Sequence, residues 1–163
     1  MSSPSEIRAQ WTRHNPGLDT SPMELVGLLK RATGLHDRAM ESLYAGAPLT
    51  PPEVDTLIPL RHATAPVIAR RLAEQLSLSR AGVSKILAKL ERRGFISRTP
   101  NPADRRTALV TITPAGAQAV DEVFPRQLAA EADLLTGLGE DRQWVLKALG
   151  RLVEEMEGKV MRG

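Results

Sequence analysis

The segment SRAGVSKILAKLERRGF, residues 79–95, decides the fold of this chain. Four of its apolar residues stand at the i, i+3, i+4, i+7 spacing of one helical face, which is predicted to pack inward: Val83, Ile86, Leu87 and Leu90. Serines and cations fall on the remaining surface: Ser79, Arg80, Ser84, Lys85 and Lys89. A helix that reads a major groove needs hydroxyls, cations and a firmly packed back, so these five residues are predicted to contact DNA. Ser79 is equally suited to cap the helix.

The segments on either side of this helix complete a small domain. A preceding helix is predicted over Ala65–Leu76, because its apolar residues recur at helical spacing. Segments 95–99 and 107–112 are rich in β-branched residues and are predicted to form two strands joined by a projecting loop, residues 100–106. Two helices followed directly by a hairpin indicate a winged helix-turn-helix DNA-binding domain over residues 61–113.

Helices are predicted on both sides of this domain. Residues 1–22 form an N-terminal extension with a short helix, and residues 24–44 carry a long apolar stripe. Thr50 and Glu53 stand at the spacing of a capping box, and further helices are expected over 114–138 and 140–160. The fold class is therefore mainly α with a small β-hairpin wing (α+β). Regions 23–60 and 114–160 are expected to supply dimerisation helices whose apolar stripes bury one another, including Val120, Phe124, Leu128 and Trp144.

The expected loop between the strands carries Asp104, Arg105 and Arg106, which are predicted to contact DNA, and two prolines that stiffen it. An aspartate beside two arginines can hold a guanidinium in a bidentate pair and so aim it. An aimed arginine at a wing tip suits a narrow minor groove, where the negative potential of DNA is enhanced. An exposed salt bridge of little energetic consequence is the alternative.

Charge is distributed unevenly along the chain. Residues 61–106 hold eleven Lys and Arg against three Asp and Glu, whereas the rest of the chain holds eleven against sixteen. Cations concentrated in the middle third predict that this part faces a polyanion such as double-stranded DNA. A solvated helical surface is the alternative.

Several other classes of function find no support in the sequence. The chain has no cysteine, and His14, His36 and His62 are far apart, so neither a thiol site nor a metal site is expected. No run of about 18 apolar residues and no N-terminal signal core occur, so we expect a cytoplasmic protein without a membrane span. Phosphate-binding glycine loops and nucleophile elbows are also absent, so we expect neither an enzyme nor a cofactor.

The stretch 76–98, together with Asp104–Arg106 and residues 109–116, resembles the MarR family of regulators. The similarity runs from about Pro22 to Met156. It implies an obligate homodimer with interleaved terminal helices, whose two recognition helices reach successive major grooves of a pseudo-palindromic operator, about 34 Å apart. It also implies control by a small, usually anionic or phenolic, ligand that alters the spacing of the recognition helices.

The N-terminal part is similar to the branch of this family that responds to urate and related purine or phenolic compounds. In that branch a tryptophan on an extra helix, an aspartate and two arginines frame the ligand. Trp11, Asp55 and Arg98 match three of these positions, and Ile86 stands where the branch has the other arginine. This difference favours a less charged or more apolar effector, such as a small aromatic or phenolic compound, or none. Trp11 as a packing residue and Asp55 as a surface charge are the alternatives.

Two functions are compatible with these observations. The first is a sequence-specific DNA-binding transcriptional regulator, a homodimeric repressor that a small ligand releases. The second is a winged-helix module that binds another protein and binds DNA only weakly. The salt dependence of DNA binding separates the two, because a protein that neutralises phosphates releases their counterions.

Overall fold

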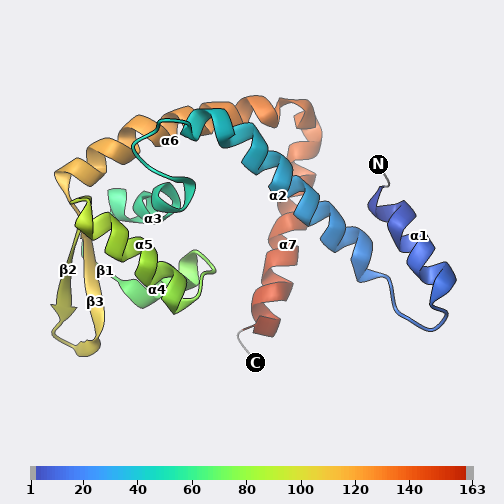
Figure 1. The fold of residues 1–163 in the computed structure, drawn as a ribbon, viewed down its shortest axis with the longest axis horizontal. Coiled ribbons are helices and arrows are strands. Elements are labelled where there is room, and N and C mark those ends of the chain that lie inside the picture. Colours follow the sequence, from blue (N-terminus) through green and yellow to red (C-terminus); the bar gives the residue numbers. More distant parts are fainter. Residues whose placement is uncertain (1–2, 161–163) are drawn as a thin grey trace. The chain divides into compact units, whose positions relative to one another are not determined.

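The computed structural model describes residues 3–160 (Figure 1). The chain divides into two compact units, residues 1–128 and 129–163, and one helix continues from the first into the second. The elements follow in the order α1 (Pro4–His14), α2 (Pro22–Tyr44), α3 (Pro51–Arg61), β1 (Val67–Ile68), α4 (Ala69–Gln75), α5 (Arg80–Arg92), β2 (Ile96–Asn101), β3 (Asp104–Ile112), α6 (Pro114–Leu134), the 3-10 helix η1 (Thr136–Asp141) and α7 (Arg142–Val160).

The predicted winged helix-turn-helix is confirmed. Helices α4 and α5 form the helix-turn-helix, and the hairpin β2–β3 stands beside α5 as the wing (Figure 1). The turn between the helices contains Ser77 at φ 51°, in the left-handed region. Ser79 is the N-cap of α5, and its Oγ accepts a hydrogen bond from the backbone N–H of Gly82 at 3.0 Å. The chain is mainly helical with one small sheet, as predicted.

Helix α4 is shorter than predicted. The helix expected over residues 65–76 comprises only Ala69–Gln75, because Val67 and Ile68 form strand β1. Pro66 has no backbone N–H to donate within a helix, and the two residues after it are β-branched and favour extended backbone. Both pair with β3, which makes a three-stranded antiparallel sheet in the order β1-β3-β2. The expected two-stranded hairpin is therefore part of a three-stranded sheet.

The wing also differs from the prediction, because its strands are longer and its loop is shorter. Strand β2 extends to Asn101 and β3 begins at Asp104, so Pro102 and Ala103 alone join them. Residues 100–106 are consequently not a projecting loop. Pro100 pairs with Ala108 and Asn101 with Asp104, and the register shift between these pairs places Arg105 and Arg106 in an irregular part of β3.

The core of the first unit lies between the helix-turn-helix, α3, the sheet and the start of α6. Its fully buried side chains include Leu57, Leu72, Leu87, Leu90, Val110, Val120 and Val123. Val120 and Phe124, which were predicted to lie in a dimer interface, instead pack in this core. The reason is that α6 begins directly after β3, so its first turns cover the sheet and α3. Leu128, which belongs to the same predicted stripe, is exposed.

Outside this core, the long helices of residues 3–160 carry exposed apolar side chains. On α2 these are Leu25, Val26, Leu28 and Leu35. The unit of residues 129–163 has no buried residue in α7 and exposes Trp144, Leu146, Leu149, Val153 and Met156. No helix within residues 3–160 is both long and apolar enough to cross a membrane.

Candidate nucleic-acid interface

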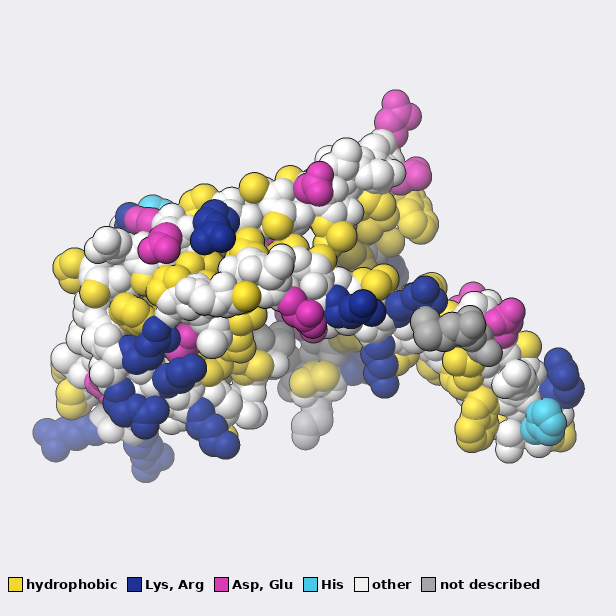
Figure 2. Space-filling view, turned by 45° about the horizontal axis from the view of Figure 1, so that its top comes forward, with side chains coloured by type: hydrophobic (Ala, Val, Ile, Leu, Met, Phe, Trp, Pro, Cys, Tyr) yellow, Lys and Arg dark blue, Asp and Glu magenta, His cyan; other side chains and the backbone are white. Residues whose placement is uncertain are grey.

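Helix α5 has one face in the core and one face in solvent, as predicted. Val83, Leu87 and Leu90 are at most 2% exposed, and Ile86 is half-buried against them. Ser84 and Lys85 are exposed on the opposite side. Figure 2 shows Lys and Arg side chains gathered over the part of the molecule that contains α4, α5 and the wing. This face therefore presents hydroxyl and cationic groups on a helix that its buried side holds firmly.

A cleft separates α5 from the wing. It encloses about 420 Å³, and its polar lining consists of Arg70, Arg80, Ser84, Arg98, Asp104, Arg106 and Thr107. Of the four guanidinium groups in this lining, those of Arg70 and Arg98 are paired with carboxylates of neighbouring residues, and those of Arg80 and Arg106 form no ion pair within residues 3–160. Arg80 and Ser84, predicted to contact DNA, and Arg106 of the wing thus face one common space.

The wing is tied to α5 through Arg98. The Nε of Arg98 donates to Oε2 of Glu91 at 2.9 Å, and its Nη2 donates to the same oxygen. This hydrogen bond lowers the pKa of Glu91 from its usual value. Arg98 was predicted to bind an effector, and the structure pairs it with a carboxylate of the recognition helix. The pair fixes β2 relative to α5.

The tip of the wing is held by side-chain hydrogen bonds to the backbone. Asn101 accepts from the N–H of Ala103 at 3.0 Å and donates to Oγ1 of Thr107 at 3.0 Å. Asp104 accepts from the backbone N–H of Arg106 at 3.0 Å. The predicted pairing of Asp104 with a guanidinium does not occur within residues 3–160, because the amide two residues ahead satisfies the carboxylate in a tight local turn. Both wing arginines, Arg105 and Arg106, are exposed.

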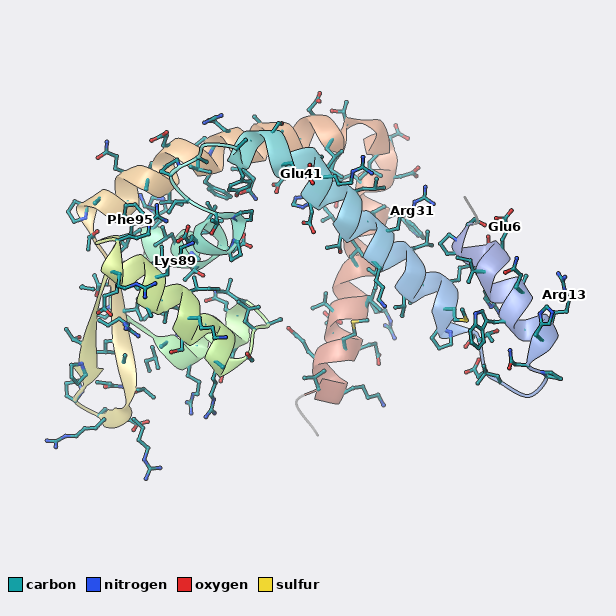
Figure 3. All side chains as sticks on the ribbon, in the orientation of Figure 1. Glu6, Arg13, Arg31, Glu41, Lys89 and Phe95 are labelled. Atoms are coloured by element: carbon teal, nitrogen blue, oxygen red, sulfur yellow. The ribbon has the colours of Figure 1, made fainter. Side chains whose placement is uncertain are left out.

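Lys89 is exposed, and it also has a carboxylate partner from another helix. Lys89 lies in the C-terminal half of α5 (Figure 3), and its Nζ is 3.3 Å from Oε1 of Glu53 in α3. Arg93 at the helix end reaches the same carboxylate, with its Nη1 2.8 and 2.9 Å from the two oxygens. Its Nη2 donates to the carbonyl of Pro48, and its guanidinium lies 4.7 Å over the ring of Phe95.

Glu53 is the buried carboxylate that organises this cluster, and it is 1% exposed. Burial alone would raise its pKa, but hydrogen bonds from the Thr50 amide, Arg93 and the Thr50 hydroxyl together lower the pKa below the usual value. The capping box of Thr50 and Glu53 was predicted and is confirmed. Its ion pairs were not predicted, since nothing in the sequence spacing links α3 to the end of α5.

The predicted effector residues lie in different places. Trp11 is half exposed on α1, Arg98 lines the cleft beside the wing, and Ile86 packs against the core. Asp55 lines a separate cavity of about 660 Å³, whose lining also includes His36, Asp37, Met40, Glu41, Tyr44 and Gln127. The Tyr44 hydroxyl donates to Oε1 of Gln127. One chain therefore does not gather the predicted set around a single ligand.

Of the residues that line this cavity, sequence reasoning named only Asp55 as an effector residue, because the walls come from α2, α3 and α6, which are far apart in the sequence. No group of three or more His, Asp or Glu side chains able to hold a metal ion occurs within the described part of the chain.

Comparisons with known proteins agree with this geometry. Residues 49–108 match the model of the MarR family. The transcriptional regulator PecS of Dickeya dadantii is 30% identical over 153 residues, which are 93% of this chain and 92% of PecS. The structure of BpsR from Bordetella bronchiseptica, a protein whose DNA binding 6-hydroxynicotinic acid regulates, is 25% identical with a TM-score of 0.70 and covers 80% of this chain and 98% of BpsR. The structure of the S. aureus MepR–DNA complex shares the fold at 22% identity and a TM-score of 0.70, over 78% of this chain and 95% of MepR. This chain belongs to the MarR family.

Proposed function

We propose that this chain is a sequence-specific DNA-binding transcriptional regulator, a homodimeric repressor that a small molecule releases. One observation carries this proposal: Ser84 and Lys85 are exposed on a helix whose opposite face is buried, beside a wing that presents two arginines. Family membership supports it, because PecS is a transcriptional regulator. The curated relatives and the family are regulators and not enzymes.

In this proposal α5 enters the major groove and the wing follows the adjacent minor groove. The N-terminal half of α5, with Arg80, Ser84 and Lys85, faces base edges and phosphates. Arg105 and Arg106 reach the minor groove, where the potential is most negative. Ser79 caps the helix by accepting a hydrogen bond at its Oγ, and its hydroxyl hydrogen can still be donated to a phosphate oxygen.

We propose residues 61–113 as the DNA-binding domain and regions 23–60 and 114–160 as the dimerisation region. The uncovered apolar side chains of α2 and α7 support this division, since monomeric proteins rarely expose large contiguous apolar patches. Sedimentation tests the dimer, and Val153→Asp, which places a charge on the exposed α7 stripe, is expected to yield monomers. A wild-type monomer at micromolar concentration would contradict the dimer.

We place the effector in the cavity between α2, α3 and α6. Its lining contains Asp37, Glu41 and Asp55 and no Lys or Arg, which supports a neutral or cationic aromatic compound in preference to an anion. We further propose membership in the urate-responsive branch from the sequence match at Trp11, Asp55 and Arg98, of which only Asp55 lines this cavity. Ile86 and the acidic lining favour an effector other than urate itself. A thermal-shift screen with urate, xanthine, salicylate and neutral phenols tests it, because a ligand of the native dimer raises its apparent stability.

DNA titration tests the proposed function directly. A duplex that the wild-type protein enriches from a random-sequence pool is compared with random duplex of the same length at several salt concentrations. We expect preference for the enriched duplex and a steep loss of affinity with salt, which reports released counterions. Equal, salt-insensitive binding to both duplexes would favour the protein-interaction module instead. The regulator is expected to act in the cytoplasm, on cellular DNA.

A further inference from the structure

Recognition helix α5 packs against the core along one face, and its C-terminal end carries an additional ionic anchor. Lys89 and Arg93 stand four positions apart, so they project from the same side of the helix. Both reach the carboxylate of Glu53, which the fold buries almost completely. The residues that face DNA, Arg80 to Lys85, lie at the other end.

Arg93 is held from three directions. A carboxylate, the carbonyl of Pro48 and the ring of Phe95 surround its guanidinium. The guanidinium group of arginine is planar with fixed donor directions, so it binds several partners at once only in one orientation. A lysine or an apolar side chain has no such orientational restriction. Glu53 is itself fixed, because its carboxylate also accepts from the Thr50 amide at 2.8 Å and the Thr50 hydroxyl at 2.9 Å.

Stability alone does not account for a charged group at this position. Lys89 and Arg93 keep part of their side chains in solvent, which screens their attraction to Glu53. In some proteins a buried polar contact instead selects one geometry. The contacts of Glu53 with Lys89 and Arg93 lie far from the first turn of α5, so a small change of helix angle there is amplified at that turn. The first turn of α5 is about 20 Å along the helix from Arg93, so a change of about 10° at the anchor moves that turn by about 3 Å.

We propose that Glu53 is a positioning residue that sets the angle of α5 and thereby determines how strongly the protein prefers its operator over random DNA. This inference rests on the proposed function. The donor–acceptor distance of a hydrogen bond varies by only a few tenths of an ångström, so a displacement of about 3 Å removes hydrogen bonds to base edges. The attraction to phosphates remains nearly intact. Glu53 therefore governs sequence-specific binding more than non-specific binding.

The test compares Arg93→Met with Arg92→Met. Both substitutions remove one positive charge from the C-terminal end of α5, but within residues 3–160 Arg92 makes no ion pair or side-chain hydrogen bond that its loss would break. Comparing the two variants therefore separates the effect of losing the contact with Glu53 from the effect of losing a positive charge. Glu53→Gln breaks the anchor from the α3 side, and Arg93→Met leaves Glu53 paired with Lys89, so at least one variant keeps the carboxylate partnered in the core.

The measured quantity is the ratio of affinities for the enriched duplex and for random duplex, with folding confirmed by circular dichroism and thermal unfolding. We expect Arg93→Met and Glu53→Gln to lower this ratio about tenfold or more, the effect of losing one good base contact, and to retain most non-specific affinity. We expect Arg92→Met to keep the wild-type ratio. A folded Arg93→Met protein with the wild-type ratio overturns the inference alone. A wild-type protein without operator preference overturns the proposed function as well.

Discussion

The junction between the wing and α6 gives a sharp prediction about Gly116. This glycine is buried in the first turn of α6, where Thr113 caps the helix by accepting from its N–H at 3.1 Å. A Cβ at this position would lie 2.0 Å from the carbonyl oxygen of Phe95 and 3.0 Å from Cγ1 of Ile112. The same Phe95 oxygen accepts from the backbone N–H of Thr113 at 3.0 Å. Gly116→Ala therefore forces the added methyl group against the backbone of Phe95.

The net effect follows from opposing contributions. Forced overpacking costs about 1–3 kcal/mol, and weakening the hydrogen bond to Phe95 adds about 1 kcal/mol. Alanine returns about 1 kcal/mol through its better helix propensity. We expect Gly116→Ala to lose about 1–3 kcal/mol, which lowers the Tm by about 2–12 °C in a chain of this length.

Thermal unfolding followed by far-UV circular dichroism measures this loss. Gly150→Ala in α7 is the matched control, because no atom lies within 4 Å of the Cβ it would add. We expect that substitution to keep or raise the Tm, by at most about 1 kcal/mol of stability. A Gly116→Ala protein that melts at or above the wild-type temperature would refute the close approach of α6 to Phe95.

Three further predictions concern function and pH. Lys85→Ala is expected to weaken binding to the enriched duplex and to reduce the slope of log affinity against log salt by about one, and unchanged affinity would contradict the assignment of α5 as the recognition helix. Trp11→Ala is expected to leave DNA affinity nearly unchanged while altering the thermal shift that an aromatic effector produces, and an unaltered shift identifies Trp11 as a packing residue. Because the pKa of folded Glu53 lies below its usual 4.5, its contribution to stability is complete above that pH and is lost as pH falls through the folded value. The free energy of unfolding in urea is therefore measured between about pH 3 and 6, the range over which carboxyl groups ordinarily titrate. We expect it to depend less steeply on pH for Glu53→Gln than for the wild type. An identical dependence would exclude an ionised Glu53 in the core.

The parts of the interface that sequence reasoning placed correctly are those whose signal is local. The stripe of Val83, Leu87 and Leu90 fixes which side of α5 is buried, so the exposure of Ser84 and Lys85 follows from helical periodicity. Capping by Ser79 was one of two roles read from the sequence, and the structure shows it. Errors arose where a partner is distant, as when Val67 and Ile68 left a predicted helix to pair with β3.

The sequence by itself determined the order of the elements, the buried face of the recognition helix and the basic character of the surface around it. Tertiary structure decided which cations have a carboxylate partner. Lys85 and Lys89 look alike in the sequence and are both exposed, but the fold brings Glu53 of α3 to within 3.3 Å of Lys89, whereas Lys85 forms no ion pair within residues 3–160. Helical spacing reports the direction of a side chain and carries no information about a carboxylate that arrives from another helix, so only packing assigns the two lysines their different roles.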